Sequence, residues 1–292
     1  MNSVHLLGGS EEKHPKSPAF PGPKDATKKS KPLLANVLDS ASKEKQTRID
    51  LRSRGIESVP GSIGQMLWLT ELDLSANSLT MLPDAIGDLV NLVSLDLSTN
   101  RLTSLPESVG QLTCLKMLSI DNNKIEELPW TIGQCTALSE LRASFNLLKA
   151  LPEATGKLRE LCLLDVHWNK LSSLPSTIGP SMARLTELDA SFNEIKYIPE
   201  GLCKVCTLEK LNLASNFNEL QELPQSIGNL QKLRVLNLSC NQLKVLPDSF
   251  ALLTNLEQLE LGENNWRFPP LHIVNQGKEV ILRKIFFMYA VC

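Results

Sequence analysis

The sequence lacks the features that mark membrane-spanning and secreted proteins. Its last apolar run, residues 285–292, is far shorter than the ~20 residues that a membrane-spanning helix needs. The first residues contain no apolar core of signal-peptide length followed by a cleavage site. We therefore expect neither a membrane span nor secretion.

Cysteine is scattered and shows no pairing pattern. The seven cysteines are Cys114, Cys135, Cys162, Cys203, Cys206, Cys240 and Cys292. None forms the flanking pairs that close an extracellular repeat domain, which favours a reducing cytoplasm. Cys203 and Cys206 have the spacing of a metal or redox pair, but no second pair and no nearby histidine completes a site. We expect no metal and no cofactor.

Charge of one sign and aromatic side chains are also scarce. The chain has 30 Lys and Arg against 32 Asp and Glu, a formal net charge of −2, which argues against broad binding to nucleic acid. Its aromatic residues are 8 Phe, 4 Trp and 2 Tyr among 292 residues. Any cluster of them is therefore informative.

What the sequence does contain is a regular repeat. An asparagine recurs every 23 to 25 residues, each time after Leu-x-x-Leu-x-Leu-x-x or a close variant. These residues are Asn77, Asn100, Asn123, Asn146, Asn169, Asn193, Asn216, Asn241 and Asn264. The period and the leucine pattern are typical of a leucine-rich-repeat solenoid. Such solenoids offer a long surface to a partner, so we interpret the chain as an interaction protein and not an enzyme.

One repeat, residues 92–110, shows how the unit should fold. Leu95 and Leu97 alternate with polar residues, which predicts a strand with its leucines directed inward. Asn100 ends this strand, and stacked asparagines can satisfy backbone groups of the turn that would otherwise be buried unpaired. Pro106 prevents continuation of the strand, and little room remains before the next one. We predict an α/β solenoid: a curved arc with a concave parallel sheet and short helical or 3-10 turns on the convex side.

The repeats divide the chain into four segments. Residues 1–32, rich in lysine and proline, are expected to be disordered because they bury too little apolar surface. Residues 33–60 should form an N-terminal cap and a partial repeat. Residues 61–270 should form about nine full repeats. Residues 271–292 are expected to cover the far apolar end, which would otherwise aggregate.

Serine, histidine and aspartate lie close together in the predicted sheet. Ser144, His167 and Ser191 occupy equivalent positions on adjacent strands, with Asp165 and Asp189 one row away. Because neighbouring strands lie about 4.8 Å apart, a weak hydrolase site is a geometric alternative. No oxyanion hole or pocket is evident, and serine is common in that column, so we favour a polar ladder and predict no catalytic residue.

Aromatic residues are concentrated at one position of three consecutive repeats. Phe145, Trp168 and Phe192 each precede a ladder asparagine, where other repeats carry residues such as Ala76 or Thr99. We expect them at the concave rim as anchors for a protein partner, since buried aromatic anchors dominate many interfaces. The charged residues beside them, Arg142, Asp165, His167 and Asp189, should orient that partner. The alternative is that the rings only stack on one another and shield the turn.

Two stretches carry a resemblance to a known family. They are Leu-Pro-Asp-Ala-Ile-Gly-Asp-Leu at residues 82–89 and Glu-Glu-Leu-Pro-Trp-Thr-Ile-Gly-Gln-Cys-Thr at residues 126–136. Over about residues 47–275 the chain resembles the plant intracellular Ras-group-related leucine-rich-repeat proteins. The resemblance implies a cytoplasmic scaffold in signal transduction, with a Ras- or Rho-type small GTPase as candidate partner. A self-associating structural repeat protein is the alternative, because the sequence does not fix the oligomeric state.

Overall fold

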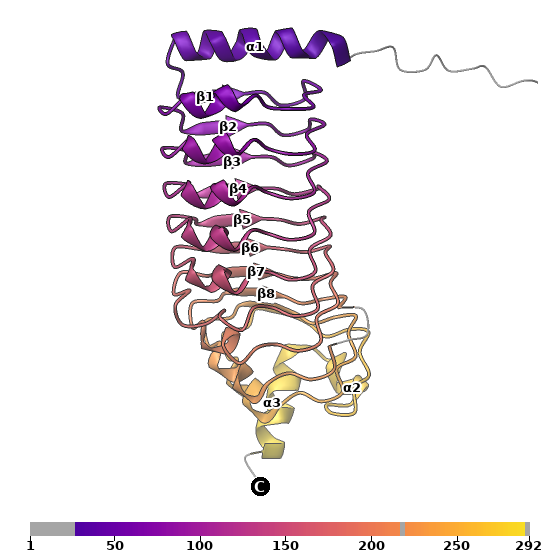
Figure 1. Cartoon of the computed structure of the whole chain (residues 1–292). Helices are drawn as coiled ribbons and strands as arrows, with labels where there is room; N and C mark the ends of the chain where they lie inside the picture. The colour runs from indigo at the N-terminus through magenta and orange to yellow at the C-terminus, as the bar shows by residue number, and fades with distance from the viewer. Residues whose placement is uncertain (1–26, 217–219, 290–292) are drawn as a thin grey trace, which may run out of the picture.

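The computed structural model describes residues 27–216 and 220–289 and shows one elongated stack of repeats (Figure 1). Ten strands form one sheet in chain order, and each pairs in parallel with the strand of the next repeat. They are β1 (Arg48–Asp50), β2 (Glu71–Asp73), β3 (Ser94–Asp96), β4 (Met117–Ser119), β5 (Glu140–Arg142), β6 (Leu163–Asp165), β7 (Glu187–Asp189), β8 (Lys210–Asn212), β9 (Val235–Asn237) and β10 (Gln258–Glu260). The predicted leucine-rich-repeat solenoid is confirmed.

The central residue of each strand fixes the inward face of the sheet. Leu72 lies in register with Leu95, and Leu95 with Leu118, and all three are buried. The residues on either side of each leucine are directed to the opposite, concave face. One apolar core therefore runs through the whole stack, and the concave face carries mostly polar and charged side chains, with Met117, Leu163 and Val235 among them.

Short 3-10 helices form the convex layer. They are η1 (Gly61–Gln65), η2 (Asp84–Asp88), η3 (Glu107–Gln111), η4 (Trp130–Gln134), η5 (Glu153–Lys157), η6 (Leu202–Lys204), η7 (Gln225–Asn229) and η8 (Asp248–Leu252). Glycine lets neighbouring helices approach, since a Cβ on Gly87 would lie 2.5 Å from the carbonyl oxygen of Ser108. Between β6 and β7 the described residues form turns in place of a 3-10 helix.

The ladder asparagines join consecutive repeats at the strand ends. In the repeat of Asn146, the side-chain Oδ1 accepts from the backbone N–H of Ile125 at 3.0 Å. Its Nδ2 donates to the carbonyl oxygens of Ile120 at 2.9 Å and Ala143 at 3.3 Å. The other ladder asparagines make equivalent bonds to the preceding repeat. The turn is buried, so these bonds replace water at backbone groups that have no strand partner.

Helices close both ends of the stack (Figure 1). Helix α1 (Thr27–Lys43) lies across the N-terminal end and buries Leu34, Leu38 and Ala41. Helices α2 (Leu271–Val274) and α3 (Lys278–Tyr289) lie at the other end, where Ile281 and Ile285 are buried. The boundary expected at residue 32 falls inside α1, and residues 1–26 lie outside the described residues, as do 217–219 and 290–292.

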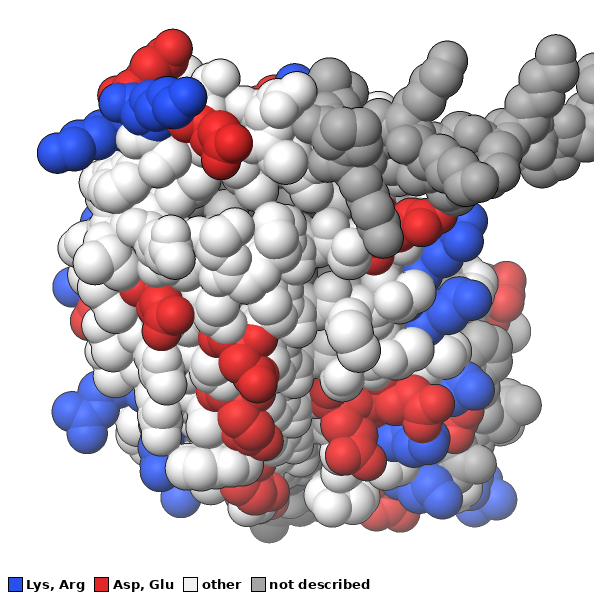
Figure 2. Space-filling view, turned by 45° about the horizontal axis from the view of Figure 1, so that its top comes forward, with Lys and Arg blue, Asp and Glu red and all other residues white. Residues whose placement is uncertain are grey.

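On the face of the molecule that Figure 2 shows, the charged side chains are grouped and not evenly spread. Figure 2 shows acidic side chains following one another along the stack, basic side chains nearer the margins, and uncharged area between them. Within the described ranges, the helices do not combine the length and apolar character that a membrane crossing requires.

Candidate functional site

The residue before each ladder asparagine has a left-handed backbone conformation. Its φ lies near +50° to +56° in repeat after repeat: Ala76 (54°), Thr99 (55°), Asn122 (54°), Phe145 (51°), Trp168 (53°), Phe192 (53°), Ser215 (56°) and Cys240 (56°). For a residue other than glycine this conformation costs roughly 1–2 kcal/mol. The tight turn requires it, and it is where the three aromatic residues lie.

The three aromatic rings form one continuous stack. The ring centroids of Phe145 and Trp168 lie 5.7 Å apart with planes 10° apart, and those of Trp168 and Phe192 lie 4.4 Å apart with planes 8° apart. Each such pair contributes about 0.5–1.5 kcal/mol beyond the burial of area, which is similar to the cost of the turn. Phe145 and Trp168 nevertheless remain 48% and 46% exposed. Stacking therefore does not hide the rings, and a rigid apolar edge faces solvent.

Two of the expected orienting residues hold one end of this stack. The His167 ring meets Phe145 edge to face, with centroids 5.0 Å apart and planes at 80°. Its Nδ1 lies 2.6 Å from Asp165 Oδ1, which also accepts from the backbone N–H of His167 at 3.2 Å. Asp165 thus fixes the imidazole, and the imidazole supports Phe145.

The remaining charged residues share a hollow on the concave face. Arg142 lies in register with Asp165, and Asp165 with Asp189. A hollow of about 280 Å³ is lined by Arg142, Leu163, Leu164, Asp165, Glu187, Leu188, Asp189, Lys210, Leu211, Asn212 and Val235. It contains acidic, basic and apolar side chains, so it suits a protein segment of mixed character better than an ion. The structure brings the seven predicted site residues onto neighbouring strands β5–β7 and the turns after them.

Sequence reasoning missed two charged residues of this hollow. Glu187 accepts from Lys210 Nζ at 2.8 Å and lies two residues before Asp189, on the same strand. Lys210 lies in register with Glu187 on the next strand. The alternation of side chains along a strand places positions i and i+2 on the same face. That alternation was the signal that would have found them.

The strand-ending aspartates also hold the turn that follows. Oδ1 of Asp189 accepts from the backbone N–H of Ser191 at 2.9 Å and from its hydroxyl at 2.6 Å. Asn237 makes the same two bonds with Ser239, at 3.1 and 2.7 Å. The turn therefore needs an oxygen acceptor and not a charge.

The serine, histidine and aspartate set lacks the contact that a hydrolase needs. The Ser191 hydroxyl donates to Asp189, and the Ser144 hydroxyl donates to Asp121 Oδ1 at 2.7 Å. A hydroxyl has one proton, so neither serine is poised to give it to His167. The set is a polar ladder in this structure.

The cysteine pair does not form a common site either. Cys203 is buried, whereas Cys206 is exposed and its thiol lies 3.5 Å from the carbonyl oxygen of Lys204. Burial raises the pKa of the Cys203 thiol, which disfavours the thiolate that binds metals. In the parts of the chain that the structure describes, no cluster of three or more His, Cys, Asp or Glu is arranged to hold a metal ion.

Comparison with known proteins agrees with this architecture. The family described as Leucine-rich repeat region matches residues 57–147, and the family described as Leucine rich repeat matches residues 206–265. Plant intracellular Ras-group-related LRR protein 4 of Oryza sativa subsp. japonica is 47% identical over 77 residues, which are 26% of this chain and 13% of the rice protein.

Solved structures are similar over a larger part of the chain. A leucine-rich-repeat protein of Leptospira interrogans is 37% identical with a TM-score of 0.74, covering 81% of this chain and 60% of that one. The leucine-rich-repeat ectodomain of an Arabidopsis thaliana membrane receptor kinase, solved in complex with Casparian strip integrity factor 2, is 33% identical with a TM-score of 0.68. That match covers 75% of this chain and 27% of the receptor, so the chain spans under two thirds of each relative's length.

Proposed function

Because the chain belongs to the leucine-rich-repeat proteins, we propose that it is a non-catalytic scaffold or adaptor that binds a protein partner on its concave face. The observation that carries this proposal is the stack of Phe145, Trp168 and Phe192, two of whose rings remain about half exposed. Large aromatic side chains of this kind dominate binding energy at protein interfaces.

The charged residues beside the stack set the orientation of the partner. Arg142, Asp165 and Asp189 line the hollow, and His167 lies between Asp165 and Phe145. Charged groups around an apolar centre contribute more to specificity and association rate than to affinity. The arrangement supports a partner whose apolar anchor rests on the rings and whose polar groups enter the hollow.

We propose further that the protein acts inside the cell, in signalling, and that its partner is a Ras- or Rho-type small GTPase. This rests on the similarity to the rice protein, whose name contains the words intracellular and Ras-group-related. The similarity covers 26% of this chain, so the proposal needs a direct test.

The test is a calorimetric titration of the protein with a plant small GTPase, loaded either with a GTP analogue or with GDP. Tighter binding of the GTP form would support an effector scaffold. Absence of binding in both nucleotide states would remove the GTPase as partner while leaving the solenoid unchanged.

A second candidate function is self-association. Phe286 and Phe287, both in α3, are 60% and 57% exposed, with ring centroids 6.0 Å apart. Exposed aromatic residues at one end of a stack suit end-to-end contact with another copy. Light scattering across a hundredfold range of concentration separates the two functions, because only a self-associating unit gains mass with concentration.

A further inference from the structure

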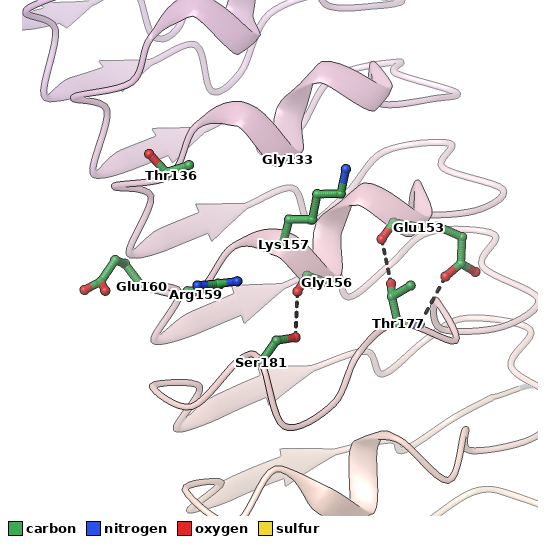
Figure 3. A pocket seen from close by; sticks show the side chains of 9 residues that line it. All are labelled: Gly133, Thr136, Glu153, Gly156, Lys157, Arg159, Glu160, Thr177 and Ser181. Carbon is green, nitrogen blue, oxygen red and sulfur yellow. Dashed lines mark hydrogen bonds between the residues drawn. The ribbon is translucent and has the colours of Figure 1, made fainter.

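The convex side of the solenoid has an opening where its layer of 3-10 helices is interrupted. Helix η5 ends at Lys157, and the described residues between β6 and β7 form turns around Gly179 and Pro180 where other repeats have a 3-10 helix. The result is an opening of about 830 Å³ that spans three repeats (Figure 3). Sites for small ligands typically have volumes of roughly 300–1,000 Å³.

Nine residues line this opening, and charged ones are prominent. They are Gly133, Thr136, Glu153, Gly156, Lys157, Arg159, Glu160, Thr177 and Ser181. The opening contains none of the three stacked aromatic residues and shares no lining residue with the concave hollow. It therefore needs an explanation that does not depend on the proposed function.

Both carboxylates of the opening already have partners. The Glu153 carboxylate accepts from the backbone N–H groups of Ser176 at 3.1 Å and Thr177 at 3.0 Å, and from the Ser176 hydroxyl at 3.0 Å. Glu160 Oε2 lies 3.0 Å from Arg184 Nη1. Figure 3 shows Glu160 directed away from the middle of the opening and Glu153 directed toward Thr177. The charge of Glu160 is therefore balanced by Arg184, whereas Glu153 is hydrogen-bonded to neutral donors and keeps its negative charge.

The two cations of the opening, Lys157 and Arg159, have no such partners among the described residues. Lys157 and Arg159 are exposed, and their side chains lie between Glu160 and Glu153 (Figure 3). Among the residues that the structure describes, neither side chain has an ion pair or hydrogen bond. Thr136 also lines the opening. With Glu160 paired to Arg184, the two cations Lys157 and Arg159 face the single carboxylate of Glu153, so the opening has an excess of positive charge.

We infer that this convex opening binds the phosphate group of a small phosphorylated ligand, held by Lys157 and Arg159. A guanidinium offers parallel N–H groups that match two phosphate oxygens, and an ammonium adds a mobile point charge. A soluble phosphate compound and the headgroup of a phosphorylated lipid present the same chemistry. The adaptor would then carry a protein on one face and a phosphorylated ligand on the other.

The test uses inorganic pyrophosphate as the probe, titrated into the full chain by calorimetry in a buffer free of phosphate. The double variant Lys157→Gln/Arg159→Gln removes both cations of the opening. The matched control Arg101→Gln/Lys124→Gln removes the same charge from exposed residues outside it. Because all four side chains are exposed, both variants should melt at the temperature of the wild type, which is measured in parallel.

The expected result is saturable binding by the wild type, at least tenfold weaker in Lys157→Gln/Arg159→Gln and changed less than twofold in the control. Absence of saturable binding by the wild type would overturn the inference, as would equal weakening in both double variants, which would indicate general charge attraction.

A second arm of the test distinguishes the two sources of phosphate. The protein is mixed with vesicles of phosphatidylcholine, with and without phosphatidylinositol 4-phosphate, and sedimented. Binding to the phosphorylated vesicles that is lost in Lys157→Gln/Arg159→Gln assigns the site to a lipid headgroup. Binding of pyrophosphate without sedimentation assigns it to a soluble ligand, and either result supports the inference.

Discussion

Trp168 and Phe192 lie face to face, with ring centroids 4.4 Å apart and planes 8° apart. Phe145 covers the other face of the indole, at 5.7 Å. A partner therefore meets the edge of Trp168 and not its face. Ring edges carry the positive part of the aromatic quadrupole, so apolar groups and hydrogen-bond acceptors are better matched to this surface than cations.

The asparagine ladder should be the most sensitive part of the fold. Asn146→Ala removes the acceptor of the buried Ile125 N–H and the contacts of its Nδ2 with three carbonyl oxygens, so we expect a loss of about 2–4 kcal/mol in the free energy of unfolding. Urea denaturation measures it. Ser104→Ala, at an exposed position, is the control and should stay within about 0.5 kcal/mol. A similarly small effect of Asn146→Ala would contradict the ladder's role.

One buried hydroxyl in η5 should lower the free energy of unfolding of the native protein. Thr155 is fully buried, and within residues 27–216 and 220–289 its Oγ1 has no hydrogen-bond partner. Thr155→Val keeps the shape and removes the unsatisfied group, so unfolding should cost about 1 kcal/mol more. Thr131→Val is the opposite case, because Thr131 Oγ1 donates to the carbonyl oxygen of Glu107 at 2.7 Å. Thermal unfolding should show the first variant stabilised and the second destabilised.

The strand-ending aspartates should tolerate loss of charge but not loss of the acceptor. Asp189→Asn keeps the oxygen that Asn237 uses in the same turn, so stability should change by less than about 0.5 kcal/mol. Asp189→Ala leaves the N–H of Ser191 without its acceptor and should cost about 1–2 kcal/mol. Equal losses in the two variants, measured by urea denaturation, would show that the charge itself holds the turn.

Cysteine reactivity should follow burial. Burial raises the pKa of the Cys135 thiol to about 11, so almost none of it is thiolate at pH 8. Cys114 and Cys206 are exposed. Iodoacetamide at pH 8, followed by mass spectrometry, should modify these two residues in the native protein and Cys135 only after unfolding. Rapid modification of native Cys135 would contradict its position in the core.

The fold was predictable from the sequence because the same short pattern of leucines and asparagine occurs in repeat after repeat. Asn100 or Leu95 alone indicates little, but the same residues recurring with nearly the same spacing in nine repeats favour one architecture, in which the regularly spaced leucines form the core. The register of the strands follows from that period. The turns that the described residues form between β6 and β7, in place of a 3-10 helix, were harder to predict from the sequence. The insertion at Gly179 and Pro180 predicts a longer loop, but it does not show that the 3-10 helix is lost.

The candidate site was predictable in position but not in geometry. Phe145, Trp168 and Phe192 each directly precede a ladder asparagine, which placed them on neighbouring repeats, and the structure finds them there. Their left-handed φ was not expected, because residues with a positive φ are usually glycine or asparagine. The Ser191 hydroxyl donates to Asp189 because of the way the two side chains are rotated within the turn. The spacing of residues along the chain does not determine these rotations.

The central claim is that a protein partner binds the stack of Phe145, Trp168 and Phe192 in the turns after β5, β6 and β7. It is tested most directly by comparing Trp168→Ala with Trp130→Ala in the titration with the small GTPase. Trp130, in η4 on the convex side, is 60% exposed and is the matched control. Ala76 already occupies the position equivalent to Trp168 in another repeat, so Trp168→Ala should fold normally.

We predict that Trp168→Ala weakens binding by more than ~1 kcal/mol, roughly fivefold, with an unchanged melting temperature, and that Trp130→Ala has no measurable effect. A lower melting temperature of Trp168→Ala with unchanged affinity would instead show that the stack is structural. Equal losses in both variants would place the binding surface elsewhere.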